Sequence, residues 1–225
     1  MKATVISSFA KDILLKGEKI EKCRGGPAFF ITKTLEKLNI PYNLFCGEEG
    51  IVEINLENGI ERGKVKKIGK IEPQKDNMNF LLVSTLLNEF KLKPLGKFNC
   101  VDIQGYVRDK NNTIKKSRYY CKELKKFDIV KATKEELQYI PKEIKKKIKI
   151  ILETNGDKGF IVSKGEKKYY FSVEKIKTTD TIGAGDTFFT AFCLKYYQTK
   201  DIVKSARYSQ KITSNFLISK MEVGK

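Results

Sequence analysis

The stretch TTDTIGAGDTFF, residues 178–189, places two glycines around Ala184, follows them with Asp186 and then runs into two phenylalanines. Glycine lets another group approach the backbone, and the N–H groups at the start of a helix attract anions. A carboxylate beside such a start can accept a proton from a hydroxyl that attacks the bound anion. We therefore predict a helix that begins near Ala184, an anion-binding turn before it and a general base at Asp186. The alternative is an ordinary helix start, at which Asp186 only complements the helix dipole.

Apolar runs of strand length surround this stretch, and helix-like stretches lie between several of them. The runs are residues 3–8, 42–46, 79–84, 98–103, 127–132, 148–154 and 159–163, with a more polar strand at 167–173. Continuous apolar strands that alternate with helices are typical of a parallel sheet covered on both faces. The sequence therefore predicts one α/β domain over residues 1–225. Ligands of such sheets gather at the carboxyl ends of the strands, where helices such as 184–197 begin.

Two half-polar segments read as hairpins outside this core. Residues 12–22 turn at Gly17, and VEINL is followed by Asn58-Gly59, a strong hairpin signal. We predict a small β flap at about residues 51–68. Because an exposed hairpin edge tends to pair with another strand, this flap either covers the substrate or joins two subunits in a homodimer.

The composition excludes several classes of protein. The chain has no histidine, which removes Ser-His-Asp and Cys-His catalysis and HExxH metal sites. Its five cysteines include no CxxC pair, so we expect reduced, buried thiols instead of disulfides or a zinc site. The sequence shows neither a signal peptide nor an apolar run long enough to span a membrane. We therefore expect a cytoplasmic protein without a membrane partner.

The net charge of the chain is strongly positive. Lysine and arginine number 45 against 27 acidic residues, which gives a formal net charge of +18. Such a charge suggests a nucleic-acid partner, but the basic residues are spread along the chain and no binding motif accompanies them. We favour a lysine-rich solvated surface and do not expect nucleic acid to be the partner.

The string D-T-x-G-A-G-D at residues 180–186 resembles the C-terminal signature of the ribokinase-like (PfkB) family of carbohydrate kinases. The resemblance implies a ribokinase-like α/β fold. It also implies that Gly183, Ala184 and Gly185 form an anion hole over the transferred phosphoryl group and that Asp186 is the catalytic base.

Three further motifs resemble the family's acceptor side. SSFAKD is similar to the first strand, which ends in an Asp that holds substrate hydroxyls, and RGGPAFF is similar to the di-glycine signature. VDIQGYVR resembles a segment of a compact subgroup related to archaeal and thermophilic inositol kinases. The implied substrate-binding residues are Asp12, Gly25, Gly26, Gln104 and Arg108. Read without the resemblance, the same residues are ordinary turn, helix-start and surface positions.

Two motifs resemble the donor side. KATKEE is similar to the N-x-x-E motif near magnesium and phosphate and keeps its acid as Glu136, although an exposed helix glutamate is the simpler interpretation. TNGDKG is similar to the T-x-G-x-x-G turn at the nucleotide, which implies binding by Thr154, Gly156 and Gly159.

The chain departs from the family pattern at several places. Phe30 and Thr133 stand where the family has Asn, GEEG replaces a longer acidic motif, and no final helix follows MEVGK. These departures concern the identity of the substrate, the handling of magnesium and the binding of the nucleotide.

The resemblance implies an ATP-dependent kinase that transfers the γ-phosphoryl group to a hydroxyl of an inositol-like or ribose-like sugar or polyol, with Mg²⁺ as cofactor. A nucleoside kinase is an alternative, because Phe29 and Phe30 in the substrate loop would also suit a base. A further alternative is a non-catalytic nucleic-acid-binding protein on a degenerate kinase fold. The intact Asp186 argues against it.

Overall fold

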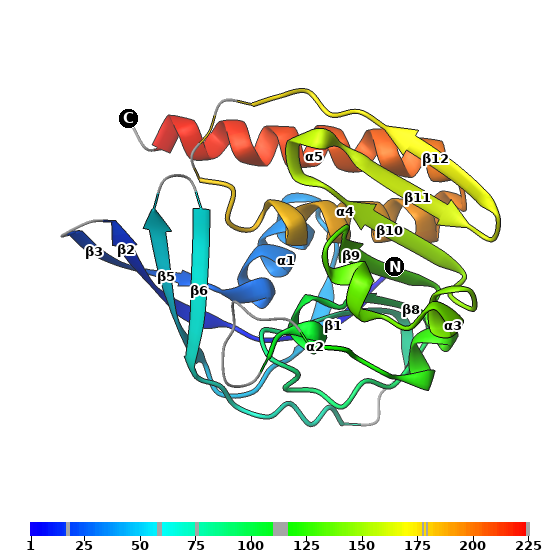
Figure 1. Cartoon of the computed structure of the whole chain (residues 1–225), viewed down its shortest axis with the longest axis horizontal. Coiled ribbons are helices and arrows are strands. Elements are labelled where there is room, and N and C mark those ends of the chain that lie inside the picture. Colours follow the sequence, from blue (N-terminus) through cyan, green and yellow to red (C-terminus); the bar gives the residue numbers. More distant parts are fainter. Residues whose placement is uncertain are drawn as a thin grey trace.

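The computed structural model describes residues 1–16, 19–57, 60–74, 77–109, 117–176, 178 and 180–223. The predicted hairpin turns at Gly17 and Asn58-Gly59 lie outside these residues. The described chain forms two sheets and a set of helices (Figure 1).

The larger sheet has eight strands in the order β12-β11-β10-β9-β8-β7-β1-β4. Neighbouring strands from β4 to β10 are parallel, whereas β11 and β12 are antiparallel. The strands are β1 (Ala3–Ser7), β4 (Tyr42–Phe45), β7 (Met78–Ser84), β8 (Gly96–Asp102), β9 (Ile129–Thr133), β10 (Ile150–Thr154), β11 (Phe160–Lys164) and β12 (Lys167–Phe171). The prediction of a mostly parallel α/β sheet is confirmed.

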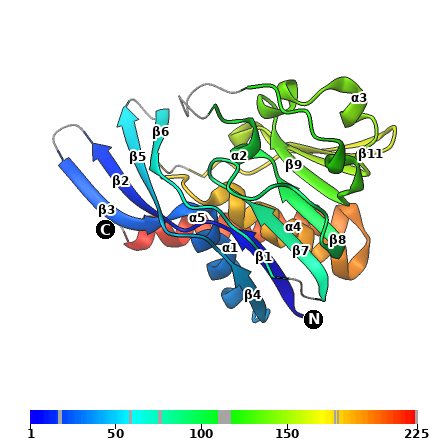
Figure 2. The same ribbon diagram turned by 90° about the horizontal axis from the view of Figure 1, so that it is seen from below.

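Two apolar cores lie on the two faces of this sheet, because side chains alternate between the faces along each strand. One core packs beneath three long helices, α1 (Gly26–Lys37), α4 (Ala184–Thr199) and α5 (Ile202–Val223). The other packs beneath short segments, namely α2 (Gln104–Val107), η1 (Lys122–Lys126), η2 (Glu136–Tyr139) and α3 (Lys142–Lys145). The expected full-length helices between the strands are thus replaced on this second face by one-turn segments. Figure 2 shows the central strands between the two layers.

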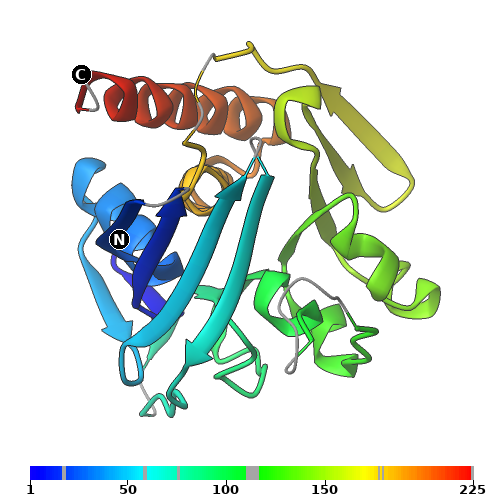
Figure 3. The ribbon, with the colours of Figure 1, turned by 60° about the vertical axis from the view of Figure 1, so that its left-hand side comes forward.

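The smaller sheet has four strands in the order β3-β2-β5-β6 and extends to the left of the main sheet in Figure 1, whereas Figure 3 shows it from the front. Its strands are β2 (Ala10–Lys16), β3 (Lys19–Gly25), β5 (Gly50–Glu57) and β6 (Ile60–Lys67). The two hairpins of the sequence are joined because β2 pairs with β5 in parallel. Ala10, Val52 and Leu86 form a small core under this sheet. We call these four strands the flap.

Two expectations from composition meet the structure directly. No disulfide links the cysteines, but only Cys100 and Cys193 are buried. The prediction of buried thiols is wrong for Cys23 and Cys46, which are exposed, and for Cys121, which is half-buried. Within the described residues, no helix is both long enough and apolar enough to cross a membrane.

Candidate active site

Three polar side chains lie side by side where β7, β8 and β9 approach their carboxyl ends. Ser84 is in register with Asp102, and Asp102 is in register with Lys131. All three residues are buried, and Lys131 Nζ donates a hydrogen bond of 2.6 Å to Asp102 Oδ2. We call these residues the polar row. These residues were not predicted from the sequence, although one signal was present: each apolar run carries a polar residue at or near its end.

Asp186 lies directly above the polar row, in the first turn of α4. Ser84 Oγ donates to Asp186 Oδ1 at 3.3 Å. Burial raises the pKa of Asp186 to about 7, and the charge of Asp102 adds to this rise, whereas Lys131, Ser84 and Arg108 lower it. A carboxyl group whose pKa is near neutrality is well suited to accept a proton from a hydroxyl.

The turn before α4 is shaped by glycine. Gly183 has φ of +86°, in the left-handed region that favours glycine, and the Ala184 N–H donates to the Thr181 carbonyl at 3.0 Å. The N–H groups of Gly185 and Asp186 have no acceptor within the helix, because they belong to its first turn. A Cβ atom added at Gly185 would lie 3.3 Å from Lys131 Nζ. The turn therefore combines first-turn N–H groups with a neighbouring ammonium group, which suits a phosphate.

The first aspartate of the signature holds this turn in place. The Ile182 N–H donates to Asp180 Oδ1 at 3.1 Å, and Lys220 Nζ forms an ion pair of 2.5 Å with the same oxygen. Lys220 Nζ also donates to the Ile182 carbonyl at 2.9 Å. The last turns of α5 are thus bonded to the segment that precedes the anion-binding turn.

Phe30 supports the same turn from α1. A Cβ atom at Gly183 would lie 2.1 Å from Phe30 Cδ1, so the ring lies against the glycine. Phe30 also makes an edge-to-face contact with Phe216, with ring centroids 6.0 Å apart. Phe29 and Phe30 lie on α1 and not on a substrate loop, so that expectation is wrong. Phe30, which replaces the family's Asn, fills space behind the turn.

Asp12, Gly25 and Gly26 come together at the base of the flap. Asp12 is buried, and a Cβ atom at Gly25 would lie 1.8 Å from Asp12 Oδ2, so only glycine leaves room for the carboxyl group. Burial raises the pKa of Asp12 to about 6, and the N–H of Gly26 lowers it. Gly26 begins α1, and Phe30 follows one helical turn later, about 6 Å along the axis. One turn of helix therefore joins this group to the anion-binding turn.

Gln104 and Arg108 are positioned by α2. The backbone N–H of Gln104, the first residue of α2, donates to Asp102 Oδ1 at 3.1 Å. The start of α2 is thus held by a residue of the polar row. Arg108 Nη1 donates to the Leu86 carbonyl at 3.0 Å, and its charge lowers the pKa of Asp186. The structure therefore places Arg108 within electrostatic reach of Asp186.

Thr154, Gly156 and Gly159 form a tight turn between β10 and β11. Gly156 has φ of +57° and open space where a side chain would be. Gly159 has φ of +93°, and a Cβ atom there would lie 2.2 Å from the Phe171 carbonyl oxygen. Thr154 is in register with Thr133, so this turn lies beside the KATKEE motif.

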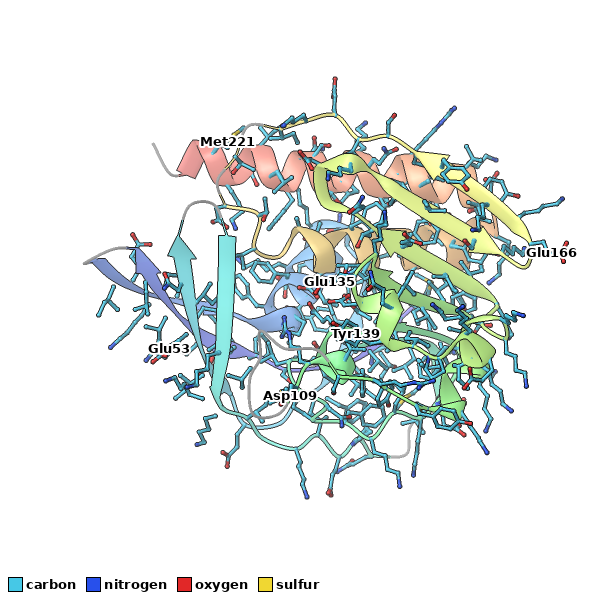
Figure 4. The ribbon with its side chains drawn as sticks, in the orientation of Figure 1. Glu53, Asp109, Glu135, Tyr139, Glu166 and Met221 are labelled. Carbon is cyan, nitrogen blue, oxygen red and sulfur yellow. The ribbon has the colours of Figure 1, made fainter. Side chains whose placement is uncertain are left out.

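Glu136 is buried and part of a reciprocal cap. The Thr133 N–H donates to Glu136 Oε2 at 2.8 Å, and the Glu136 N–H donates to Thr133 Oγ1 at 3.1 Å. The interpretation of Glu136 as an exposed, solvated residue is therefore wrong. Figure 4 shows the side chains of Glu135 and Tyr139, which lie at the two ends of this segment.

A divalent metal would need ligands beyond the protein at this site. Among the described residues, no three acidic or cysteine side chains are grouped to hold a metal ion. Glu136 lies close enough to Asp102 and Lys131 for its charge to raise the pKa of both. The site therefore fits a metal that arrives with phosphate and water as its main ligands.

Comparisons with known proteins agree with this geometry. The model of the pfkB family of carbohydrate kinases matches residues 108–220, half of the chain. No curated protein matches the sequence significantly.

Solved structures share the fold at low sequence identity. A pyrophosphate-dependent kinase of the ribokinase family, solved with a pyrophosphate analogue and myo-inositol, superposes with a TM-score of 0.77 at 20% identity over 96% of this chain and 95% of that one. A ribokinase from Thermotoga maritima gives 0.68 at 16% identity over 94% and 91%. A fructokinase double mutant from Vibrio cholerae gives 0.69 at 15% identity over 93% and 89%. The chain therefore belongs to the pfkB family of carbohydrate kinases and is a phosphotransferase that acts on a sugar hydroxyl.

Proposed function

We propose that the chain transfers the terminal phosphoryl group of ATP to a hydroxyl of an inositol-like or ribose-like polyol. The observation that carries the proposal is the position of Asp186, whose carboxyl group has a pKa raised to about 7 and lies beside a glycine turn and Lys131. A base, an anion-binding turn and a cation at one place are the components that phosphoryl transfer requires.

The reaction follows from these components. Asp12 and the backbone at Gly25 and Gly26 would hold the hydroxyls of the acceptor, so that one hydroxyl faces the phosphoryl group. Asp186 accepts the proton of that hydroxyl while the hydroxyl oxygen forms a bond to the terminal phosphorus of the donor. At the same time the bond between this phosphorus and the leaving phosphate breaks. The N–H groups at Gly185 and Asp186 and the ammonium of Lys131 stabilise the negative charge on the phosphoryl oxygens. The rate enhancement thus comes mainly from positioning and electrostatics.

Mg²⁺ would bind with the donor and supply charge neutralisation on its phosphates. Glu136 would act on this ion through water, because one of its oxygens accepts the Thr133 N–H. Thr154, Gly156 and Gly159 would bind the donor beyond its terminal phosphate.

Pyrophosphate is a second candidate donor. The glycine turn and Lys131 recognise a terminal phosphoryl group, which ATP and pyrophosphate share. The solved structure of a pyrophosphate-dependent kinase that spans nearly the whole chain favours testing this donor beside ATP. The argument for a nucleoside acceptor is weaker, because Phe30 lies against Gly183 and is not placed to stack on a base.

We also propose that two chains associate through the flap, whose outer strands β3 and β6 each have one edge without a partner within the flap. Five free cysteines fit a reducing compartment, for which the cytoplasm is our proposal.

The test is a phosphoryl-transfer screen of the purified chain. ATP and pyrophosphate, each with Mg²⁺, are combined with inositol, ribose, fructose and nucleosides, and the phosphorylated product is measured. We expect turnover with at least one sugar or polyol, and we expect Asp186→Asn to lower it by at least about a hundredfold. Turnover only with nucleosides, or none with any pair, would contradict the proposal.

A further inference from the structure

A polar pocket of about 330 Å³ opens at the end of α2. It is lined by Asn88, Tyr106, Arg108, Asp109, Ser117, Arg118 and Tyr119. Of these residues, only Arg108 was expected from the sequence to bind the substrate.

Described contacts hold the wall of this pocket. The Ser117 N–H donates to the Val107 carbonyl at 2.7 Å, and the Tyr119 N–H donates to the Tyr139 carbonyl at 3.0 Å. The ring of Tyr106 is almost fully buried next to Tyr119, with ring centroids 5.3 Å apart. Backbone hydrogen bonds hold Ser117 and Tyr119 to neighbouring segments, so the backbone that carries the side chain of Arg118 is held in place.

The charge of the pocket favours an anion. Arg108 and Arg118 contribute two positive charges against one negative charge from Asp109, which leaves one positive charge among the lining residues. Arg118 makes no ion pair within the part of the chain that the structure describes. Burial raises the pKa of Tyr106 and of Tyr119 well above the usual range, so both hydroxyls stay neutral. Guanidinium groups bind phosphate and carboxylate through paired hydrogen bonds, and hydroxyl side chains such as Ser117 add single ones.

The pocket is connected to the reacting centre through Arg108. The same side chain lines the pocket and lies near enough to Asp186 to lower the pKa of its carboxyl group. It also donates to the carbonyl of Leu86, a residue of the core beneath the flap. Because Arg108 connects the pocket to Leu86 and to Asp186, a ligand in the pocket would lie beside α2 and next to the reacting centre.

We propose that this pocket binds an anionic substituent of the acceptor, so that the preferred acceptor is an acidic polyol, either a phosphate monoester or a carboxylate. Arg118 contacts the substituent directly, Arg108 contacts both the substituent and the adjacent hydroxyls, and the hydroxyl of Ser117 completes the contacts. This inference rests on the proposed function, since it names the class of acceptor.

The test compares acceptors that differ only in the acidic group. Ribose and ribose 5-phosphate, fructose and fructose 6-phosphate, and glucitol and gluconate are assayed as pairs with ATP and with pyrophosphate. We expect the acidic member of at least one pair to have a kcat/KM about tenfold to a hundredfold higher, as hydrogen bonds to a charged group imply. The first two pairs test the phosphate ester, and the third tests the carboxylate.

Variants then locate the preference. Arg118→Gln is expected to reduce the ratio of kcat/KM between the acidic and neutral members at least about tenfold, mainly through KM. Arg207→Gln, an exposed arginine on α5, is the matched control and should keep the ratio. An equal preference for neutral and acidic acceptors, or a ratio that Arg118→Gln leaves unchanged, would overturn the pocket assignment while the kinase proposal stands.

A binding measurement separates the two proposals if no pair turns over. Titration calorimetry measures the affinity of the chain for ribose 5-phosphate and gluconate, and for the neutral ribose and glucitol, in the absence of a phosphoryl donor. Acidic ligands that bind the wild type at least about tenfold more tightly than Arg118→Gln would support the pocket even if the reaction were of another kind. Equal binding to both proteins would refute it.

Discussion

Asp12 and Asp186 are two buried carboxyl groups with raised pKa values in very different surroundings. Asp12 lies on β2 of the flap, where burial raises its pKa to about 6 and the N–H of Gly26 is the main opposing influence. Asp186 stands above the rigid parallel strands, where Asp102, Lys131, Ser84 and Arg108 all act on it. Burial is the largest influence on the pKa at both sites, but only at Asp186 do several neighbouring charges act beside it.

This difference separates two tasks. A group that must gain a proton and lose it again benefits from charges that set its pKa near the working pH, as at Asp186. A group that orients an uncharged hydroxyl needs a fixed position, which glycine packing provides at Asp12. Variants at Asp186 and its neighbours test the first task, and a variant at Asp12 tests the second.

Asp186→Asn should lower kcat by about a hundredfold to ten-thousandfold, because an amide cannot accept the proton. Donor binding should persist, since the backbone N–H groups of the turn remain and one negative charge is lost. The melting temperature should not fall, because a buried charge has been removed. Steady-state kinetics, donor titration and thermal melting on one preparation measure all three. A folded variant with wild-type turnover would refute the role of Asp186.

Gly185→Val should reduce kcat by about a hundredfold with little loss of stability. Gly185 is helical and has no positive φ, so the backbone tolerates a side chain, but its Cβ would lie 3.3 Å from Lys131 Nζ and its branches would obstruct the phosphate. Gly165→Ala is the opposite control, because Gly165 has φ of +59° and open space around it. That control should lose stability and keep its turnover.

Asp12→Asn should raise the KM for the acceptor about tenfold and change kcat less, because it weakens a hydrogen bond to an oriented hydroxyl. Asp201→Asn is the matched control, since Asp201 caps α5 and Asn is an equally good cap. If the variant at Asp12 lost as much kcat as the variant at Asp186, the two carboxyls would not have separate tasks.

Asp102→Asn should shift the acidic limb of the pH profile of kcat/KM to lower pH. The charge of Asp102 raises the pKa of Asp186, so without this charge Asp186 loses its proton at a lower pH. Lys131→Met should shift the limb to higher pH, because Lys131 lowers the same pKa. Asp12→Asn should leave the position of the Asp186 limb unchanged. If the acidic limb moved in the same direction in Asp102→Asn and Lys131→Met, these two charges would not act on the pKa of Asp186 as described.

The raised pKa also fixes the sign of a stability effect at Asp186. Its pKa is 3.8 in a model peptide and about 7 in the folded chain, so the folded state holds the proton more tightly. The stabilisation from this group is present below about pH 4 and is lost as the pH rises through 7. Unfolding by denaturant across that range should therefore show a flatter dependence on pH in Asp186→Asn than in the wild type.

Glu136→Gln should raise the Mg²⁺ concentration needed for half-maximal rate by a few-fold and leave stability nearly unchanged, because glutamine also completes a capping box. Thr133→Ala should do the reverse and cost about 1 kcal/mol of stability through the lost cap. A magnesium titration unchanged in Glu136→Gln would make Glu136 a capping residue alone.

The parts of the fold that depend on local pattern were predictable. Apolar runs predicted the parallel strands. The glycine signature predicted a helix that begins near Ala184, and Ala184 is the first residue of α4. The polar row was not predicted as a unit, because it exists only through the register that brings Asp102 and Lys131 together. The parallel pairing of β2 with β5 was missed for the same reason, since a hairpin signal describes only neighbouring strands.

The role of Phe30 shows a different limit. A motif comparison treats the position as a substrate contact that has lost its Asn, whereas the ring packs against Gly183 and Phe216. That contact joins residues more than 150 positions apart in the chain. No periodicity or spacing within the sequence reports it.

The contact between Phe30 and Gly183 also restricts how this chain can change over evolution. Any side chain at position 183 would collide with the ring, and a smaller polar residue at position 30 would leave a void beside the turn and a polar group to satisfy. Phe216, on the other side of the ring, would lose its partner at the same time. We therefore expect the effects of substitutions at positions 30, 183 and 216 on stability to be non-additive, because each position contacts Phe30 or is Phe30 itself.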